Sequence, residues 1–352
     1  MRARILVVGD SFCPSSTLRE AFTELETVHE VTYADVVDEP GWVPVSPSDR
    51  RIAEAFGSPR QVIELLDRHD ILVVQGAAVT DEVLAAAGSL RLVCCARGGP
   101  VNVDVAAATA RGIPVVTTPG KNADAVADLT LAFVVMLARR LPEVIRHVEA
   151  GGVFAHDNYE GAQWFGHDLA GMVLGLVGYG QVGRRVALRA MAFGMRVVAF
   201  DPFVEPSSVA TDGVEPVDLD TLLATSDVVS LHARATDANA GLIGDGAIAA
   251  MKDGALLINT ARGSLIDEDA VLAGLASGRL AGLAVDVISP SPATGRHPLL
   301  DHPNVIVTTH IGGATYETLR HGGEMAAAEI VRFLAGESLR NVADRSVLEA
   351  AR

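Results

Sequence analysis

An arginine and a histidine each follow an apolar run that has the length of a β-strand. Arg262 lies in Asn259–Gly263, directly after the run Ala255–Ile258, and His310 follows the run Val305–Thr308. The planar guanidinium of an arginine suits a bidentate grip on a carboxylate, and an imidazole, with an ordinary pKa of about 6.5, exchanges protons near neutral pH. Each residue also has a structural alternative, because a strand-end arginine can be a surface ion-pair partner and a single histidine is more often structural than catalytic.

A glycine-rich turn follows a third apolar run. Val173–Val177 leads directly into Gly178-Tyr179-Gly180-Gln181-Val182-Gly183, and the spacing predicts a helix over Val182–Phe193. In such strand–turn–helix units the first glycine permits the tight turn and the second lets the backbone approach a pyrophosphate. The third lets the helix pack on the strand, and the helix N-terminus faces the phosphates. The flanking strand and helix make this motif more specific than an isolated glycine pattern, and we predict that Gly178, Tyr179, Gly180, Gln181, Val182 and Gly183 bind a dinucleotide.

The next strand-like run, Arg196–Phe200, ends at Asp201-Pro202, eighteen residues beyond Gly183. A carboxylate at this position accepts hydrogen bonds from the ribose hydroxyls and repels a 2′-phosphate. The same two residues could form only a strand-ending turn. In combination with the glycines, Asp201 and Pro202 predict NAD rather than NADP.

Strand-length apolar runs alternate with helical spacing along most of the chain. Continuous apolar strands that alternate with helices indicate parallel sheets covered on both faces. Because about eleven strands are unusual in one open sheet, we predict an α/β fold with two doubly wound parallel sheets. The remaining runs are Ile5–Val8, a weaker one at Val31–Tyr33, Ile71–Val74, Leu92–Cys95, Val115–Thr117, Val228–Leu231 and Leu283–Val285.

The boundary between the two domains is predicted near Pro119–Asn122. A long apolar helix follows over Ala123–Arg140, and Pro142 discourages its continuation. This helix is apolar enough to be buried, and one place for it is a subunit interface. The segment Gly151–Gly171 is interpreted as an extended arm or loop.

The helical segment Thr315–Leu334 is too short to form a domain, and we expect it to pack back on the first domain. Residues 1–121 and 313–352 would then form one domain, and residues 122–312 would be inserted into it. The chain would cross twice between the domains, with a cleft between them.

Composition excludes several classes of protein. The chain has 352 residues, a net charge of -16 and a pI of about 5.0. Nucleic-acid binding needs a basic surface, and the chain as a whole is acidic. It has no uninterrupted apolar stretch of about 18 residues and no signal-peptide core. We therefore expect a soluble, cytoplasmic protein with no nucleic-acid or membrane partner.

Cysteines and histidines give no pattern typical of a metal site. Cys13, Cys94 and Cys95 are too few and too closely spaced for a disulfide framework or a zinc site, so we expect them to be reduced. His297 and His302 lie near His310 in sequence, but each precedes a proline in a turn and they do not share one rigid element. No metal is predicted.

Taken in order, these motifs resemble those of the D-isomer-specific 2-hydroxyacid dehydrogenase family, in its phosphoglycerate-dehydrogenase-like branch. The resemblance covers most of residues 70–335. It implies a Rossmann NAD-binding domain inserted into a flavodoxin-like substrate domain. The segments that carry it are Gly178–Gly183 with Asp201, Ser230–His232, Asn259–Gly263, Leu283–Val287, His310–Ala314, Arg97–Gly99, Val103–Asp104, Ala106–Pro114 and Thr118–Gly120.

The resemblance implies a role for each residue that matches. Arg262 would clamp the substrate carboxylate and polarise the 2-keto oxygen, and His310 would exchange the proton of that oxygen. Backbone amides around Arg97, Gly98 and Gly99 would hold the carboxylate, and Arg97 could contact a second anionic group or form an ion pair at the edge of the cleft. The positions that would line the cofactor, besides the glycine turn, Asp201 and Pro202, are His232, Thr260, Ala261, Asp286, Gly312 and Gly313; for His232 a structural role is equally open.

One position departs from the family pattern. A glutamate usually stands five residues after the position of Asp286, and this chain has Ser291 there. Ser291 can orient His310 by a hydrogen bond but cannot supply a charge. We therefore expect keto acid reduction to fall off at lower pH than in typical relatives, unless another carboxylate replaces the missing one.

Two functions of different classes follow from the resemblance. The first is an NAD-dependent dehydrogenase that interconverts a small D-2-hydroxy acid and its 2-keto acid, and the second is an NAD(H)-sensing binding protein with little turnover. The presence of both Arg262 and His310 favours the enzyme, because a sensor does not need both. The family analogy further implies a homodimer.

Overall fold

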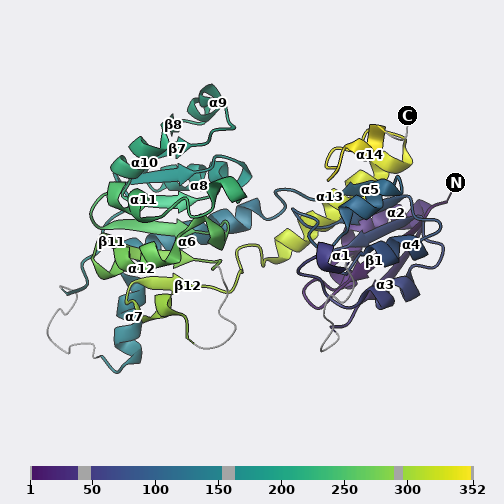
Figure 1. The fold of residues 1–352 in the computed structure, drawn as a ribbon, viewed down its shortest axis with the longest axis horizontal. Helices are drawn as coiled ribbons and strands as arrows, with labels where there is room; N and C mark the ends of the chain where they lie inside the picture. Colours follow the sequence, from purple (N-terminus) through teal and green to yellow (C-terminus); the bar gives the residue numbers. More distant parts are fainter. Residues whose placement is uncertain (1, 39–48, 153–162, 289–295, 350–352) are drawn as a thin grey trace. The chain divides into compact units, whose positions relative to one another are not determined.

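The computed structural model describes residues 2–38, 49–152, 163–288 and 296–349. Contacts divide the chain into two compact units. Unit 1 consists of Met1–Asn122 and Ala314–Arg352, and unit 2 is the continuous stretch Ala123–Gly313. Unit 2 is thus inserted into unit 1, as the colours of Figure 1 show.

Unit 1 contains a five-stranded parallel sheet in the order β2-β1-β3-β4-β5. This is the strand order of flavodoxin-like doubly wound folds, as predicted. The strands are β1 (Arg4–Gly9), β2 (Glu30–Asp35), β3 (Ile71–Val74), β4 (Leu92–Cys95) and β5 (Val115–Val116).

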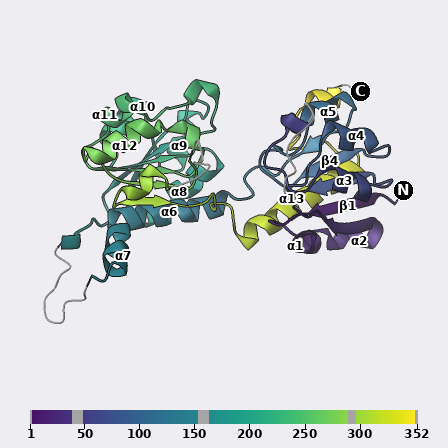
Figure 2. The same ribbon diagram turned by 60° about the horizontal axis from the view of Figure 1, so that its bottom comes forward.

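Both faces of this sheet are covered by helices, because successive residues of each strand point to opposite sides. Ile5 and Val7 of β1 pack in one core cluster with residues of α1, α2 and α13, whereas Leu6 and Val8 pack in another with residues of α3, α4 and α5. Helix α13 lies beside α1 (Figure 1, Figure 2), as expected for the segment after residue 315. The helices are α1 (Ser15–Leu18), α2 (Thr23–Val28), α3 (Pro59–Leu65), α4 (Asp81–Ala86), α5 (Val105–Ala110), α13 (Tyr316–Leu334) and α14 (Ser346–Glu349).

Unit 2 contains a seven-stranded parallel sheet in the order β12-β11-β10-β9-β6-β7-β8. Counted from its first strand, this is the Rossmann order with a seventh strand added at one edge. The strands are β6 (Val173–Val177), β7 (Arg196–Phe200), β8 (Glu215–Pro216), β9 (Val228–Leu231), β10 (Ala255–Asn259), β11 (Leu280–Val285) and β12 (Val305–Val307).

Helices also cover both faces of the second sheet. One core cluster joins α6 and α8 to the sheet, and the other joins α10, α11 and α12 to its opposite face. The helices are α6 (Ala123–Ala138), α7 (Leu141–Glu149), α8 (Gln181–Ala192), α9 (Pro206–Thr211), α10 (Leu219–Thr225), α11 (Asp245–Ala250) and α12 (Glu268–Ala276).

The long helix α6 is buried within its own unit, where it packs along α8 and against β10 and β11. It ends at Ala138, two residues before the predicted end, because Arg140 takes a left-handed conformation with φ of 52°. A second helix, α7, then begins at Leu141 with Pro142 in its first turn, where proline is well tolerated. Residues 153–162, within the predicted arm Gly151–Gly171, lie outside the described part of the chain.

No helix in the described ranges combines the length and the apolar character that crossing a membrane requires.

Candidate active site

The glycine-rich turn has the backbone geometry that the sequence predicts. Gly178 has φ of 100°, and a Cβ there would lie 2.5 Å from the backbone nitrogen of Ala233. A Cβ at Gly183 would lie 2.3 Å from the carbonyl oxygen of Gly178, so the start of α8 approaches the end of β6 more closely than any side chain permits. A Cβ at Gly180 would meet nothing within 4 Å. Two of these glycines are therefore required by the fold, and the third leaves space above the turn.

The start of helix α8 fits an anionic ligand. Its N-cap is Gly180, and no described side chain caps its first turn, which contains no acidic residue. The first backbone N–H groups of an α-helix lack partners within the helix and carry a partial positive charge. Together with the space at Gly180, this arrangement fits a dinucleotide pyrophosphate.

Asp201 lies at the carboxyl end of β7, beside the turn. One carboxylate oxygen accepts a 2.8 Å hydrogen bond from the backbone N–H of Tyr179, and the other accepts a 2.9 Å bond from that of Phe203. Each oxygen has a second lone pair, so the carboxylate can still accept a bond from a ribose hydroxyl. Pro202 is exposed.

The side chain of Tyr179 faces the core rather than the turn. It is fully buried, and its hydroxyl donates a 3.0 Å hydrogen bond to Asp212. Burial and the neighbouring carboxylate raise the pKa of Tyr179. Tyr179 therefore supports the turn from within, and only its backbone lies at the predicted site.

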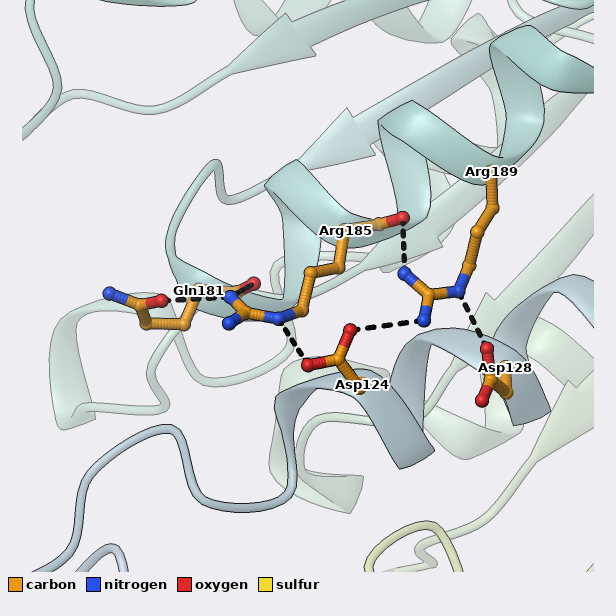
Figure 3. Close-up of polar contacts among 5 residues, drawn as sticks. All are labelled: Asp124, Asp128, Gln181, Arg185 and Arg189. Atoms are coloured by element: carbon orange, nitrogen blue, oxygen red, sulfur yellow. Dashed lines mark hydrogen bonds and ion pairs between the residues drawn. The ribbon is translucent and has the colours of Figure 1, made fainter. Parts of the chain in front are cut away.

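Gln181 is held by a chain of ion pairs between helices α6 and α8 (Figure 3). Arg185 donates to the side-chain oxygen of Gln181 at 2.9 Å and to Asp124 at 2.8 Å. Arg189 bridges Asp124 at 3.0 Å and Asp128 at 2.6 Å. The hydrogen bond from Arg185 lowers the pKa of Asp124. Each exposed pair contributes less than about 1 kcal/mol, so the network serves mainly to fix the side chain at the start of α8.

Asp286 organises the loop that carries His310. It follows β11, is 2% exposed, and accepts a 2.9 Å hydrogen bond at its carbonyl oxygen from the backbone N–H of His310. Its carboxylate accepts bonds from the Thr308 hydroxyl at 2.5 Å and from the backbone N–H groups of Ile311 at 2.8 Å and Gly312 at 2.7 Å. These contacts fold residues 308–312 into a turn in which His310 takes a left-handed φ of 61° with an exposed side chain.

Asn259 holds the loop that carries Arg262 in a similar way. It is fully buried at the end of β10, where its side-chain amide donates a 2.8 Å hydrogen bond to the carbonyl of Arg262 and accepts one from the N–H of Ala261 at 3.0 Å. The guanidinium of Arg262 is exposed, and it forms no ion pair within the described part of the chain. The carbonyl of Asn259 in turn accepts a 3.0 Å bond from the N–H of Asp286.

The structure therefore brings Arg262 and His310 to the same edge of the unit 2 sheet. Strand β11 lies between β10 and β12. Asn259, at the end of β10, anchors the loop of Arg262, and Asp286, directly after β11, anchors the loop of His310, which follows β12. This is the edge at which open parallel sheets bind ligands.

The other predicted cofactor positions differ in accessibility. His232 is half-buried, its ring nitrogen lies 3.0 Å from the Ser230 hydroxyl, and burial lowers its pKa to about 4. Thr260 is 8% exposed, and its hydroxyl lies 3.0 Å from that of Thr130. Both side chains thus contact neighbouring hydroxyl groups, and their place at the cofactor is an expectation from the family resemblance alone.

In unit 1, Arg97 follows β4 and pairs with Glu54, whose carboxylate and backbone carbonyl both accept from its guanidinium. Gly98 and Gly99 are exposed, and a Cβ at either would meet nothing within 4 Å. The ion pair that the sequence leaves open for Arg97 is therefore present, while the adjacent backbone is free to approach a ligand.

The structure does not test the prediction for Ser291, and it adds Asn259 to the residues that support the site. Ser291 lies outside the described residues. Within those residues, no group of three or more histidine, cysteine or carboxylate side chains could hold a metal. The motif Asn259–Gly263 does not by itself indicate the anchoring role of Asn259. The signal that could identify it is a polar residue directly after an apolar strand, which Asn259 shares with Asp286.

Comparison with known proteins places these features in a family. Residues 131–312 match the model of the NAD-binding domain of D-isomer specific 2-hydroxyacid dehydrogenases. The D-3-phosphoglycerate dehydrogenase of Archaeoglobus fulgidus is 36% identical over 293 residues, which are 83% of this chain and 54% of that protein. The human protein of the same name is 35% identical over 290 residues, 82% of this chain and 53% of its own. The chain spans about half the length of the curated relatives it matches.

Solved structures align over nearly the whole chain. The TT0316 protein of Thermus thermophilus is 33% identical with a TM-score of 0.76, over 97% of this chain and 100% of that one. A glyoxylate reductase from Paecilomyes thermophila is 26% identical with a TM-score of 0.73, over 98% and 100% of the two chains. With the family model matched over the unit that contains the glycine turn, Arg262 and His310, the chain belongs to the D-isomer specific 2-hydroxyacid dehydrogenase family and carries its NAD-binding domain.

Proposed function

We propose that this protein is an NAD-dependent oxidoreductase that interconverts a small D-2-hydroxy acid and its 2-keto acid. The observation that carries the proposal is the pairing of Arg262 and His310 at one sheet edge, each anchored by a buried residue at a neighbouring strand end, Asn259 or Asp286. Relatives named as D-3-phosphoglycerate dehydrogenase and glyoxylate reductase support this reaction class.

Arg262 binds the substrate. Its guanidinium is exposed and has no carboxylate partner among the described residues, so its planar fork is available for a carboxylate and for the neighbouring 2-keto oxygen. As that oxygen gains negative charge during reduction, the interaction with the guanidinium strengthens, which lowers the barrier. In unit 1, the exposed backbone at Gly98 and Gly99, beside Arg97, offers donors that the family resemblance assigns to a substrate carboxylate.

His310 moves the proton. In the direction of reduction its ring donates a proton to the 2-keto oxygen, and in the direction of oxidation it removes the proton from the 2-hydroxyl. NAD(H), when bound, supplies or accepts the hydride at C2. Asp286 does not touch the reacting atoms; it is a positioning residue that holds the turn from which His310 projects.

The residues around the glycine turn hold the cofactor. Gly180 and the N–H groups of Gln181, Val182 and Gly183 would contact the pyrophosphate, and the Asp201 carboxylate would accept from the adenosine ribose. The positions that complete the proposed cofactor site are Gly178, Pro202, His232, Thr260, Ala261, Gly312 and Gly313, with Tyr179 and Asp286 supporting it from the interior.

The absorbance of NADH, followed with a panel of 2-keto acids, tests the proposal. Arg262→Ala and His310→Ala should each reduce turnover by at least about 100-fold. Arg196→Ala and His167→Ala are matched controls, because both residues lie before or at the amino ends of strands, and both variants should keep turnover. If no keto acid oxidises NADH while NADH still binds, the protein is an NAD(H)-sensing binding protein instead.

We also propose that the protein works as a cytoplasmic homodimer. The three cysteines are free and buried, which suits a reducing compartment, and the dimer follows from the family resemblance. Light scattering coupled to gel filtration would show a single species of one chain mass if the dimer proposal is wrong.

A further inference from the structure

Thr130 is a fully buried polar residue on the otherwise apolar inner face of helix α6. Its hydroxyl oxygen lies 2.8 Å from the carbonyl oxygen of Val126, one turn earlier in the helix. It also lies 3.0 Å from the hydroxyl oxygen of Thr260, which directly follows β10. Thr130 therefore forms a polar link between α6 and the start of the loop that carries Arg262.

The acceptors fix the positions of the two hydroxyl protons. The Val126 carbonyl has no proton to give, so Thr130 donates the 2.8 Å bond to it, as threonine in a helix commonly does to the residue four positions earlier. Because a hydroxyl has a single proton, the 3.0 Å bond between the two threonines uses the proton of Thr260, and Thr130 accepts it. The bond therefore runs in one direction, from Thr260 to Thr130.

Two elements thus hold the Arg262 loop, which we define as residues 260–262. Asn259 belongs to β10 and binds the backbone of the loop, through the N–H of Ala261 and the carbonyl of Arg262. Thr130 belongs to α6 and binds the first side chain of the loop. Functional groups are placed most precisely when hydrogen bonds to regular elements lock the residues that carry them.

The same turn of α6 lies close to the turn that carries His310. A Cβ added at Gly312 would lie 3.4 Å from Cγ2 of Val126 and 3.7 Å from Cδ2 of Leu129. The backbone N–H of Gly312 is in turn held by the Asp286 carboxylate at 2.7 Å. A single turn of α6 is therefore near both loops whose side chains are proposed to act on the substrate.

Helix α6 is itself fixed within unit 2, to which all these residues belong. Its inner face packs along α8 and against β10 and β11. On its outer side, Asp124 and Asp128 form ion pairs with Arg185 and Arg189 of α8 (Figure 3). A hydrogen bond from the Arg262 loop to this helix therefore ties the loop to the core of the unit.

We propose that Thr130 is a positioning residue for Arg262, because by accepting the Thr260 proton it holds the Arg262 loop on the turn of α6 that also lies close to the His310 turn. The inference rests on the proposed function, in which Arg262 binds the carboxylate and the 2-keto oxygen of the substrate. Being fully buried, Thr130 touches neither substrate nor cofactor and acts only through the loop.

Thr130→Val tests this role, because valine keeps the shape of threonine and removes the acceptor of the Thr260 proton. We expect kcat/KM for the 2-keto acid to fall by about 10-fold, as a small displacement of Arg262 predicts. The affinity for NADH should be unchanged, since the glycine turn and Asp201 are not disturbed. Thr130→Ser keeps the hydroxyl and should restore most of the activity.

Thr225→Val is the matched control. Thr225 donates a 2.7 Å bond to the carbonyl of Thr221 within α10, as Thr130 does to Val126 within α6, but it precedes β9 and lies at the opposite edge of the sheet. This variant should keep the kcat/KM of the wild type. An equal loss in Thr225→Val and Thr130→Val would show that any buried helix threonine has this effect, and would overturn the inference.

A double variant separates positioning from a merely structural role. If Thr130 acts through Arg262, then Thr130→Val should cause no further loss of turnover in a protein that already carries Arg262→Ala, because residues that act as a unit give non-additive losses. A general weakening of the fold predicts that the two losses multiply. Multiplied losses would therefore overturn the inference.

A readout without turnover keeps this inference distinguishable from the proposed function. Hydrogen exchange followed by mass spectrometry should show faster exchange of the amides of residues 260–263 in Thr130→Val than in the wild type, with unchanged exchange in the glycine turn, residues 178–183. That result supports the inference even if no keto acid oxidises NADH, which is the outcome that contradicts the proposed function. Equal exchange of residues 260–263 in both proteins would overturn it.

Discussion

The backbone N–H of His310 donates a 2.9 Å hydrogen bond to the carbonyl oxygen of Asp286, and the carboxylate of the same aspartate holds the next two backbone amides. The buried aspartate therefore fixes both sides of the turn that exposes the imidazole. Rigid support of this kind matters because misplacing a catalytic group by about 1 Å can reduce the rate by about 100-fold.

Asp286→Asn should lower kcat strongly. The asparagine amide would place N–H groups against a backbone donor, leaving a buried N–H unpaired, which costs about 1–3 kcal/mol. We expect kcat to fall by about 10- to 100-fold and the free energy of unfolding to fall by the stated amount, as measured by urea denaturation. Thr308→Val removes one bond to the same carboxylate without disturbing the backbone amides and serves as the milder control. Full activity in Asp286→Asn would contradict the positioning role.

His310→Asn and His310→Val should differ in stability but not in activity. Both lose the imidazole, and turnover should fall by at least about 100-fold in each. Asparagine tolerates the left-handed conformation that residue 310 adopts with φ of 61°, whereas a β-branched residue does not. We expect the free energy of unfolding of the valine variant to be about 1–2 kcal/mol lower than that of the asparagine variant. Equal stabilities would show that the turn does not enforce this conformation.

Gly180→Ala and Gly183→Ala should separate cofactor binding from folding. The added Cβ meets nothing within 4 Å at position 180, so this variant should keep its Tm while its affinity for NADH decreases. At position 183 the Cβ would lie 2.3 Å from the Gly178 carbonyl oxygen, and the strain should cost about 1–3 kcal/mol of stability. Thermal unfolding and fluorescence titration with NADH measure the two effects. A large decrease of Tm in Gly180→Ala would show that this glycine is needed for folding rather than for cofactor binding.

His232 should make stability depend on pH. Its pKa is about 4 in the folded protein because of burial, against about 6.5 in the unfolded chain. Between these values the unfolded chain binds a proton that the folded protein does not, so the free energy of unfolding decreases as the pH falls from about 6.5 toward 4, by up to about 3 kcal/mol. Above pH 6.5 or so His232 contributes no pH dependence. Urea unfolding at several pH values should give a shallower dependence in His232→Gln; identical slopes would contradict the burial of this imidazole.

The sequence predicts the strands of both sheets well, because most of them are continuous apolar runs. Ile71–Val74, Leu92–Cys95 and Val173–Val177 match β3, β4 and β6 at both ends. Strand β8 was missed because it has two residues, Glu215 and Pro216, neither of which is buried. Helix α7 was missed because Pro142 was interpreted only as an end of the preceding helix.

The anchoring of the candidate site could not be predicted from spacing. Asn259 and Asp286 are far apart in sequence, and their partnership depends on β10 and β11 being neighbours in the sheet. Motifs identify residues that face a ligand, whereas the residues that hold them in place become visible only through the tertiary arrangement.

The insertion of unit 2 into unit 1 also sets an order of assembly during synthesis. All of Ala123–Gly313 leaves the ribosome as one stretch, and its two core clusters lie within it. The face of the first sheet formed by Ile5 and Val7 packs against Ala326 and Ile330 of α13, which is translated after unit 2. Until the inserted unit has been completed, that face of the nascent N-terminal sheet is covered only in part, by α1 and α2. Exposed apolar surface of this kind favours aggregation during synthesis.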